Sequence, residues 1–432
     1  MARIFGTDGV RGVANKELTV ELAMNLGKAG AYVLTKEKAH KPTILVGGDT
    51  RISGEMLANA LMAAIAYLTR HYGYDAGVVI SASHNPSEYN GIKFFNGDGY
   101  KLSDLLEDEI EEVMRMNSAE LPMPVGGEVG HITYRYDAKD DYVRFACSLI
   151  DLDLSGLKIV VDTAEGASYY TAPKTLESLG AKPVVIHNHP DGVNINRACG
   201  STHMEELKKR VVEEGADLGI AFDGDADRML AVDENGNMVD GDQIMAICGL
   251  YMRNQGRLKK DTVVATVMSN LGFFRMGEKE GINIVRTKVG DRYVLEYMLA
   301  NGCNLGGEQS GHVIFLDENT TGDGLISALH LLEVIVKSGK KLSELASVMR
   351  VLPQALVNAR VSNIKKEYYM DNKVVADAVA ELEARFAGAG RVLIRPSGTE
   401  PLVRVMIEGD DQKFIEEEAK KLAEIIEKNI GE

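Results

Sequence analysis

The first residues that could do chemistry form a short polar segment, Ser81-Ala-Ser83-His84-Asn85-Pro86, directly after the apolar run 77–80. Ligands of open α/β sheets gather beyond the carboxyl ends of strands, so the hydroxyl of Ser83 is well placed to react. A proline at position 86 favours a turn there. The glycines of residues 90–99 then favour a tight loop that presents Lys93. An ordinary polar loop at a strand end would explain this segment about equally well.

A second candidate is a cluster of three aspartates, Asp223, Asp225 and Asp227, which follows the apolar run 218–222. Alternate positions of an extended segment point to the same side, so the three carboxylates would converge. Carboxylate oxygens suit Mg²⁺, and a cation would offset their mutual repulsion. A calcium loop of the EF-hand type is excluded, because Arg228 stands where that loop needs glycine. A solvated acidic turn is the alternative, but the flanking apolar strands favour a metal site.

A third candidate is the glycine-rich segment 306–312 between two strand-like runs. Glu308 and Ser310 could offer an acceptor and a hydroxyl to the hydroxyl groups of a sugar, and His312 could transfer a proton. Such a segment is more often only a turn, so by itself it is weak evidence.

A fourth candidate lies near the end of the chain. Arg395, Ser397, Thr399 and Arg404 supply two guanidinium groups and two hydroxyls, and Gly398 lets neighbouring backbone N–H groups converge. Paired guanidinium and N–H donors bind dianions well. We therefore predict a phosphate cradle here, with a plain β-hairpin connection as the alternative.

The composition limits the class of protein, and the class of ligand, to which these groups can belong. The chain has 432 residues, of which 45% are hydrophobic and 26% charged, which indicates roughly three ordinary domains and little disorder. A net charge of -16 argues against nonspecific nucleic-acid binding. An anionic substrate would therefore have to be drawn in by local cationic groups.

The cysteines and apolar runs indicate a cytoplasmic protein. Cys147, Cys199, Cys248 and Cys303 lie far apart in the chain, which fits neither a disulfide framework nor a zinc motif. No apolar run reaches membrane-spanning length, and the first residues lack the apolar core of a signal peptide. We expect no membrane partner, and the sequence leaves the oligomeric state, including a homodimer, undecided.

Strand-like and helical patterns alternate along most of the chain, which is typical of parallel sheets covered on both faces. The expected strands are 43–46, 77–80, 157–161, 183–186, 218–222, 229–232 and 262–267, and the expected helices are 54–70, 169–179 and 204–214. The last part reads as a smaller α+β module, with strands 355–361, 390–394 and 402–408 and helices 373–386 and 412–429. We expect domain boundaries near residues 150, 250 and 360, giving domains 1–150, 151–250, 251–360 and 361–432. The three α/β cycles could be a structural repeat, although no sequence repeat proves it.

Together, a serine, an acidic cluster, a polyol-binding loop and a phosphate cradle describe phosphoryl transfer on a phosphosugar. The sequence resembles the α-D-phosphohexomutase family through segments 5–12, 81–86, 223–228, 307–312 and 395–401, which follow in the family's order across nearly the whole chain. Segments 5–12 and 307–312 look more like the branch that acts on glucosamine phosphates than the glucose/mannose branch.

The resemblance implies three α/β domains with mostly parallel mixed sheets and a smaller C-terminal domain around a central cleft. It implies a phosphorylated Ser83 that converts glucosamine 6-phosphate to glucosamine 1-phosphate through a bisphosphate, with a hexosamine or glucose bisphosphate as primer. Mg²⁺ would be held by Ser83, Asp223, Asp225 and Asp227 and would offset charge in the transition state. The rival functions are phosphomannomutase or phosphoglucomutase activity and a noncatalytic phosphosugar-binding protein.

The resemblance also implies roles for other residues. Arg11, Lys93 and Arg228 would flank the transferred group, with Lys93 and His312 as acid/base partners. Arg395, Ser397, Gly398, Thr399 and Arg404 would hold the second phosphate, while Lys288, Gly290, Glu308 and Ser310 would read the sugar.

One departure from the family is large. Members have another strand between the helix that begins near residue 54 and the strand that precedes Ser83, and roughly 20 residues are absent here. The loss of a strand exposes a sheet edge, so we expect the first domain to be less stable than the family norm. A smaller departure is Glu165, where the family usually has asparagine.

Overall fold

The structure, a computed structural model, describes residues 3–6, 8–57, 63–116, 121, 124–386, 388–397 and 400–431. It divides into two compact units. The first comprises the described residues up to 268 together with 280–348, and the second comprises 269–279 and the residues from 349 onward.

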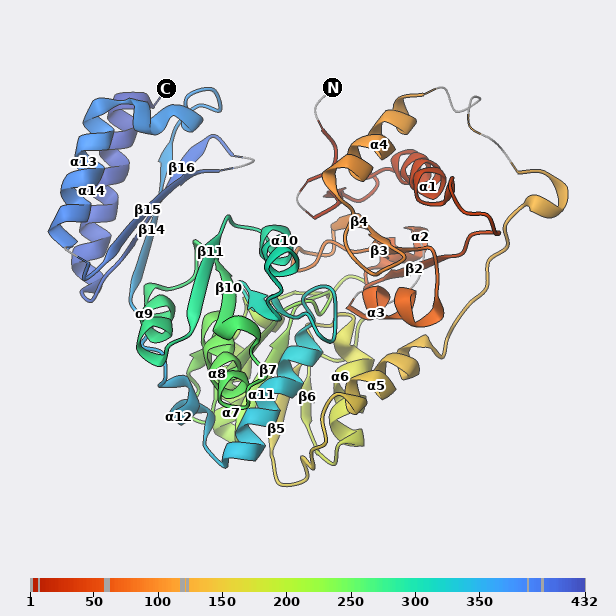
Figure 1. Cartoon of the computed structure of the whole chain (residues 1–432), viewed down its shortest axis with the longest axis horizontal. Helices are drawn as coiled ribbons and strands as arrows, with labels where there is room; N and C mark the ends of the chain where they lie inside the picture. Colours follow the sequence, from red (N-terminus) through yellow and green to blue (C-terminus); the bar gives the residue numbers. More distant parts are fainter. Residues whose placement is uncertain are drawn as a thin grey trace. The chain divides into compact units, whose positions relative to one another are not determined.

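The first sheet has the strand order β1-β4-β3-β2. Two of its helices begin at side-chain caps: Thr19 accepts from the N–H of Leu22 at the start of α1, and Ser103 accepts from the N–H of Leu106 at the start of α4. The helices α1 and α4 pack side by side on this sheet (Figure 1). The elements of this part are β1 (Val10–Val13), α1 (Val20–Thr35), β2 (Ile44–Gly48), α2 (Ile52–Leu57), α3 (Ala63–Tyr72), β3 (Ala76–Ile80), β4 (Tyr89–Asn96) and α4 (Asp104–Arg115).

The second and third sheets repeat one topology. In each, a first strand pairs in parallel with a second strand on one side and a third strand on the other, and a fourth strand is antiparallel to the third. The second sheet contains β5 (Ile159–Asp162), β6 (Val184–Ile186), β7 (Leu218–Phe222), β8 (Met229–Asp233) and β9 (Met238–Val239); the third contains β10 (Thr262–Thr266), β11 (Asn283–Thr287), β12 (Leu305–Gly307) and β13 (Val313–Phe315). The structural repeat considered from the sequence is therefore present in these two sheets.

The helices of this unit connect and cover the sheets. They are α5 (Ala138–Ser148), α6 (Ser168–Ser178), α7 (Glu205–Glu214), α8 (Gly241–Asn254), α10 (Asp291–Asn301), α11 (Gly324–Ser338) and α12 (Leu342–Ala346), with short 3₁₀ turns η2 (Gly126–Glu128), η3 (Gly200–Thr202) and η4 (Lys259–Asp261). None of the helices in the described part of the chain is long and apolar enough to cross a membrane.

The first sheet is a shortened version of this repeat, as expected from the sequence. Strands β2, β3 and β4 correspond in pairing and direction to β5, β7 and β8. Within the described residues, no strand takes the place that β6 and β11 occupy, so β2 is the edge of its sheet. Accordingly Val46 in β2 is 39% exposed, whereas β5 is buried throughout.

The helix predicted over 54–70 corresponds to two helices. The structure places α2 at Ile52–Leu57 and α3 at Ala63–Tyr72, and residues 58–62 between them lie outside the described residues. The other strands and helices expected from the sequence are present, and their ends lie within about two residues of those expected.

The loop predicted around Lys93 is wrong. Residues Tyr89–Asn96 form strand β4, which pairs with β1 on one side and β3 on the other. Gly91 serves close packing and not a turn, because a Cβ there would lie 2.5 Å from the carbonyl oxygen of Ser81. The strand thus holds Lys93 rigidly at a central position of the sheet.

The second unit is a three-stranded antiparallel sheet with two helices on one face (Figure 1). Its apolar core lies between the sheet and these helices. The unit contains α9 (Leu271–Glu280) for all but its last residue, β14 (Gln354–Arg360), η5 (Lys366–Asp371), α13 (Lys373–Phe386), β15 (Arg391–Pro396), β16 (Leu402–Glu408) and α14 (Gln412–Ile430).

Strand β2 should exchange its amide hydrogens faster than the corresponding strand β5. An edge strand has a row of N–H groups without a neighbouring strand, and such groups open with little free energy. We expect peptides spanning 44–48 to exchange at least about tenfold faster than peptides spanning 159–162 in hydrogen–deuterium exchange. Equal protection of the two strands would contradict the assignment of β2 as a weak edge.

Candidate active site

Ser83 lies at the carboxyl end of β3 in a strained and buried turn. Its backbone has a φ of 53°, which is unusual for a residue other than glycine, and its side chain is 1% exposed. The N–H of Ser83 donates to Oγ of Ser81 over 2.9 Å. Its own Oγ donates to Oδ2 of Asp223 over 2.7 Å. The serine hydroxyl is therefore directly connected to the aspartate cluster.

The three aspartates converge, but for a different reason from the one predicted. Asp223, Asp225 and Asp227 offer oxygens within 4.8 Å of one another, and all three are buried. The segment is a tight turn and not an extended strand: the N–H of Ala226 donates to the carbonyl of Asp223, and Ala226 has a φ of 62°. The predicted extended geometry is thus wrong, because the turn itself folds the carboxylates together.

This cluster fits a divalent cation. Burial raises the pKa of Asp223 well above its usual range, and the charges of Asp225 and Asp227 raise it further. One oxygen each of Asp225 and Asp227 is buried without a hydrogen-bond partner. A hard cation such as Mg²⁺ would satisfy both oxygens and offset the repulsion that the cluster otherwise bears.

Addition of Mg²⁺ should therefore raise the thermal stability of the protein. A ligand at 100 times its Kd stabilises the folded state by about 2.7 kcal/mol, which would appear as a rise of Tm in calorimetry. In Asp225→Asn most of this rise should be lost, while the exposed matched control Asp98→Asn should keep it. An equal Mg²⁺ effect in Asp225→Asn and the parent would exclude this cluster as the site.

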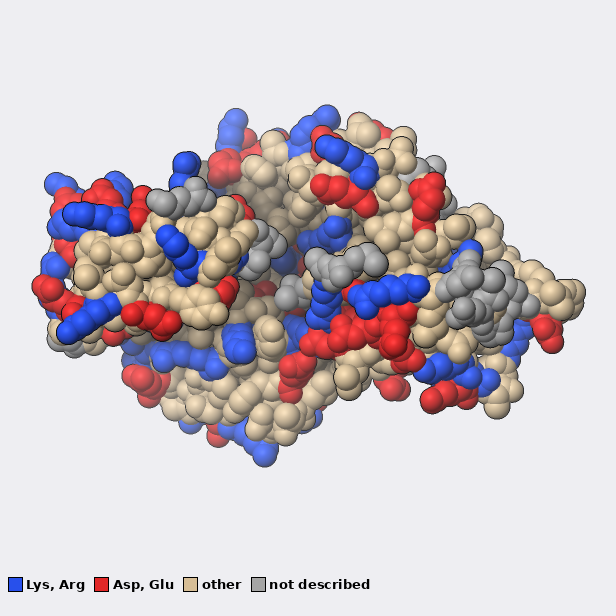
Figure 2. All heavy atoms as spheres, turned by 90° about the horizontal axis from the view of Figure 1, so that it is seen from above, with Lys and Arg blue, Asp and Glu red and all other residues tan. Residues whose placement is uncertain are grey.

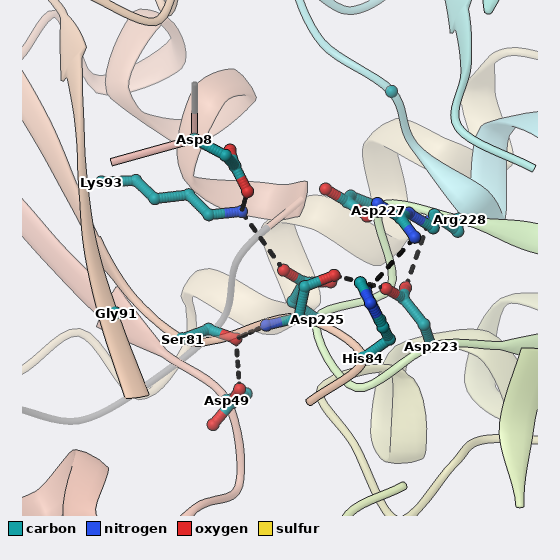
Figure 3. A network of polar contacts seen from close by, with 12 residues as sticks. Asp8, Asp49, Ser81, His84, Gly91, Lys93, Asp223, Asp225, Asp227 and Arg228 are labelled. Carbon is teal, nitrogen blue, oxygen red and sulfur yellow. Dashed lines mark hydrogen bonds and ion pairs between the residues drawn. The ribbon is translucent and has the colours of Figure 1, made fainter. Parts of the chain in front are cut away.

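Basic groups surround the cluster (Figure 3). Nζ of Lys93 lies 2.6 Å from Asp8 and 3.5 Å from Asp225, and Lys93 is 2% exposed. Arg11, on β1, pairs with Asp8. These positions bring two of the three cationic residues expected at the transferred group to the same side of the cluster.

Arg228 is the third of these residues, and it contacts His84. Its Nη1 lies 3.3 Å from Nδ1 of His84, and its Nε lies 3.7 Å from Asp227. Burial and the charge of Arg228 together lower the pKa of His84 to about 4. His84 is therefore neutral near pH 7 and can accept a hydrogen bond from the guanidinium.

A cavity of about 420 Å³ lies beside this network. The surface in Figure 2 shows both signs of charge interspersed, and the cavity lining likewise combines three basic side chains with four carboxylates. Its lining consists of Ile4, Gly6, Asp8, Gly9, Arg11, Lys101, Asp227, Arg228, Val289, Gly290, Asp291, Glu308 and His312.

A row of charged side chains along the cavity was not predicted from the sequence. Nζ of Lys101 lies 2.7 Å from Asp8 and 2.5 Å from Asp291. Asp291 in turn lies 3.4 Å from Nε2 of His312. These are single charged residues spaced far apart in the chain, so no local pattern could have linked them.

His312 is held through both ring nitrogens. The N–H of Gly322 donates to Nε2 over 3.1 Å, which leaves the ring proton on Nδ1, 3.4 Å from Asp227. In this arrangement the histidine orients Asp227 and has no free nitrogen for a substrate. Its predicted part in acid/base chemistry would require it to release one of these partners.

The residues expected to read the sugar are only partly brought together. Glu308 and Gly290 line the cavity, and the N–H of Gly290 donates to Oε1 of Glu308 over 3.1 Å. Ser310 and Lys288 are exposed, and Nζ of Lys288 lies 5.8 Å from the centre of the Tyr293 ring.

The predicted phosphate cradle lies in the second unit. Arg395 and Arg404 are directly opposite each other on β15 and β16, where like charges repel unless an anion or an acid lies nearby. Arg404 pairs with Glu400 over 2.9 Å, and Oγ of Ser397 accepts from the N–H of Glu400. The hairpin named as the alternative is also present, since β15 and β16 are antiparallel neighbours. Gly398 and Thr399 lie outside the described residues.

Two further residues that hold Ser83 were missed. Nη2 of Arg51 donates to the carbonyls of Ser83 and Asn85, over 3.0 and 2.5 Å. Nδ2 of Asn196 donates to the same two carbonyls, over 2.9 and 3.0 Å. Gly224 packs against this clamp, because a Cβ there would lie 2.6 Å from the carbonyl oxygen of Ser83. Only the position of Arg51 shortly after a strand could have hinted at such a role.

Family models match the chain from end to end. Those described as phosphoglucomutase/phosphomannomutase α/β/α domains I, II and III match residues 2–66 and 62–120, 140–236 and 240–352, and the model of the C-terminal domain matches 356–425. The chain belongs to the phosphoglucomutase/phosphomannomutase family.

Similar proteins support the same assignment. Proteins named phosphoglucosamine mutase from Acetivibrio thermocellus and Clostridium acetobutylicum are 61% and 58% identical to this chain, over 100% of both sequences. Among solved structures, a putative phosphomannomutase from Thermus thermophilus has a TM-score of 0.77 at 23% identity, covering 98% of this chain and 99% of its own. An N-acetylphosphoglucosamine mutase from Aspergillus fumigatus, in complex with GlcNAc-6P and magnesium, has a TM-score of 0.70 at 17% identity, covering 98% and 95%. These two likenesses show a shared fold.

The comparisons also locate the shortened part of the chain. The alignment with the Acetivibrio protein spans 449 positions, more than the 432 residues of this chain, so the relative has residues that this chain lacks. The model of domain I matches in two pieces that meet at residues 62–66. This is the connection between β2 and β3, where the first sheet lacks the counterpart of β6 and β11.

Proposed function

We propose that this protein interconverts glucosamine 6-phosphate and glucosamine 1-phosphate through a phosphoserine on Ser83. The observation that carries the proposal is the 2.7 Å hydrogen bond from the Ser83 hydroxyl to Asp223, which joins a buried nucleophile to a cluster that fits a divalent cation. The full-length relatives at 58–61% identity that are named phosphoglucosamine mutase support the choice of substrate.

In the forward reaction the phosphoryl group leaves Oγ of Ser83 and bonds to the free C1 hydroxyl of glucosamine 6-phosphate. The P–Oγ bond breaks and a P–O bond to the C1 oxygen forms; the C1 hydroxyl gives up its proton and Oγ of Ser83 takes one up, which gives a bisphosphate. After this intermediate turns over, its phosphoryl group at C6 returns to Oγ of Ser83, and glucosamine 1-phosphate remains. A hexosamine or glucose bisphosphate would phosphorylate Ser83 at the start, and we place the reaction in the cytoplasm.

The residues around Ser83 supply positioning and charge. Asp223, Asp225 and Asp227 would hold Mg²⁺, which when bound offsets negative charge on the transferred phosphoryl group. Lys93 and Arg228 lie on opposite sides of the cluster, and Lys93 is the proposed acid/base group, since its Nζ lies between Asp8 and Asp225. We assign the second phosphate to Arg395, Ser397 and Arg404, and the sugar hydroxyls to Glu308.

A coupled assay on three sugar phosphates tests the proposal. With Mg²⁺ and a bisphosphate primer, glucosamine 6-phosphate should give the highest kcat/KM, ahead of mannose and glucose phosphates. A clear preference for glucose 1-phosphate would overturn the amino-sugar assignment while leaving the mutase chemistry in place. Absence of turnover on all three, with no phosphate on Ser83 by intact mass, would favour a noncatalytic binding protein.

A further inference from the structure

A second cluster of metal-binding side chains lies in the second sheet, apart from the aspartate cluster. Asp162 ends strand β5, His187 follows β6, and Cys199 precedes η3. One ligand atom from each of the three lies within 4.8 Å of the other two. Asp162 and Cys199 are fully buried, and the side chain of His187 is 19% exposed. The cluster therefore combines one oxygen, one nitrogen and one sulfur in a nearly closed site.

The imidazole of His187 lies between two carboxylates. Its Nε2 lies 3.2 Å from Glu206 and its Nδ1 lies 2.9 Å from Asp162. Nδ1 is buried, and its contact with Asp162 raises the pKa of His187 above its usual value. A ring that donates from Nε2 to Glu206 would direct the lone pair of Nδ1 toward the oxygen of Asp162. Such a contact is repulsive unless a second proton or a cation lies between the two atoms.

The backbone prepares Asp162 to act as a ligand. Its two carboxylate oxygens accept one N–H each, from Ala164 over 2.8 Å and from Gly200 over 2.9 Å. These bonds fix the orientation of the carboxylate, and each oxygen keeps a second lone pair. Ala164, His187 and Ala198 all have φ values between 50° and 57°, an unusual grouping of left-handed residues around one cluster.

The thiol completes the ligand set. In the absence of a cation, burial and the charge of Asp162 raise the pKa of Cys199 to about 12, so the sulfur stays protonated. A bound cation would displace that proton, together with the second proton of the His187 ring.

We propose that Asp162, His187 and Cys199 form a second cation site, selective for a thiophilic divalent ion of the Zn²⁺ type. Thiolate and imidazole ligands favour such ions, whereas Mg²⁺ prefers a shell of oxygens, so the two clusters would select different metals. Three protein ligands leave the fourth tetrahedral position to water, while Glu206 accepts from Nε2 and orients the ring. The spacing of the cysteines gave no sign of this site, because its ligands come from three separate segments of the chain.

The site would act on catalysis by holding a loop in place. Asn196 lies in the same segment as Cys199, and its N–H donates to the carbonyl of Ala164 over 3.0 Å. Its side chain reaches the carbonyls of Ser83 and Asn85. A cation that joins Cys199 to β5 and β6 would therefore restrict the segment that positions the Ser83 turn. It is a structural site and contributes no group to the reaction.

Cobalt provides a direct test, since Co²⁺ bound to a thiolate gives a sulfur-to-metal charge-transfer band that oxygen ligands do not produce. The full-length protein is stripped of metal, supplied with excess Mg²⁺ to occupy the aspartate cluster, and titrated with Co²⁺. We expect the band to appear at one equivalent and to be abolished by Zn²⁺. It should be lost in Cys199→Ser and kept in Cys248→Ser, a matched control at another buried cysteine. Absence of the band in the parent protein would overturn the proposal, whatever the variants do.

Thermal unfolding gives a second and independent measurement. With Mg²⁺ present throughout, Zn²⁺ should raise Tm of the parent and of Asp225→Asn, but not of His187→Gln. A Zn²⁺ effect that is lost in Asp225→Asn and retained in His187→Gln would place the ion at the aspartate cluster and overturn the proposal. Asp225→Asn disables only the proposed mutase site. Failure of the mutase assignment would therefore appear in the turnover assay, whereas failure of this inference would appear in the Co²⁺ and Zn²⁺ measurements.

Discussion

Replacement of Ser83 by alanine should reduce kcat by at least about 10³-fold, since removal of a nucleophile that forms a covalent intermediate costs this much or more in other enzymes. The change removes the Oγ that carries the phosphoryl group and that donates to Asp223. Intact-mass measurement after treatment with a bisphosphate should show one added phosphoryl group on the parent and none on Ser83→Ala.

The control for this experiment is Ser87→Ala, a partly exposed serine just beyond the same turn. The Ser87→Ala variant should still be phosphorylated on Ser83 and should keep the kcat of the parent. Loss of the Ser83 hydroxyl costs about 1 kcal/mol as a hydrogen bond, so the fold of the variant should persist and Mg²⁺ should still raise its Tm. Turnover of Ser83→Ala within about tenfold of the parent would mean that another group carries the phosphate.

The parts of the fold that could be predicted are those with a strong local signal. Strands β7 and β16 and helix α13 begin and end at the predicted residues, because unbroken apolar runs and a helical apolar period leave few alternatives. Strand β4 was mistaken for a loop, because Gly91 and Asn90 suggest a turn when only local preferences are weighed. The glycine is required by the carbonyl of Ser81 on the neighbouring strand, which is a tertiary contact that no local pattern contains.

The same distinction applies to the site. Ser83 and the three aspartates follow strand ends, where sequence alone indicates a site, and the structure brings them together. Asp8, Lys101 and Asp291 pair only after the chain has folded, so each looks like an ordinary surface charge in the sequence. The convergence of the three aspartates was predicted, but their backbone conformation was not. An extended segment and a tight turn can both bring alternate side chains to one side, so the sequence does not distinguish them.

Replacement of Arg51 by methionine should be the most damaging change outside the reacting groups. The guanidinium is fully buried, pairs with the buried Asp49 and donates to the carbonyls of Ser83 and Asn85. Burial lowers the pKa of Arg51 to about 10, so it stays charged at neutral pH. Removal of one partner from a buried ion pair costs about 3–5 kcal/mol, because the other charge is left without compensation. We expect a lower Tm and a fall in kcat of about 10²-fold, because the Ser83 turn would shift.

A rescue variant separates stability from positioning. Adding Asp49→Asn to Arg51→Met removes the uncompensated charge and should restore part of the Tm, while kcat stays low because the carbonyl of Ser83 still lacks its donor. The half-exposed Arg115, which pairs with Glu111, provides the matched control, and Arg115→Met should change both quantities little. Full recovery of kcat together with Tm would show that Arg51 acts through stability alone.

Asn196 shares both acceptors with Arg51, so the two changes should not be additive. With Arg51 present, Asn196→Ala leaves each carbonyl one donor, and a fall in kcat of about tenfold is expected. With Arg51 replaced, the same change strips the last donors from the carbonyls of Ser83 and Asn85 and should cost more. A double-mutant cycle on kcat/KM should give a coupling energy of about 0.5–3 kcal/mol between these residues.

Strict additivity would mean that the two side chains hold the turn independently. Coupling would show that Asn196, between β6 and η3, and Arg51, between β2 and α2, fix the phosphate-carrying serine as one clamp. Such a clamp would keep Ser83 in place although the first sheet has lost a strand.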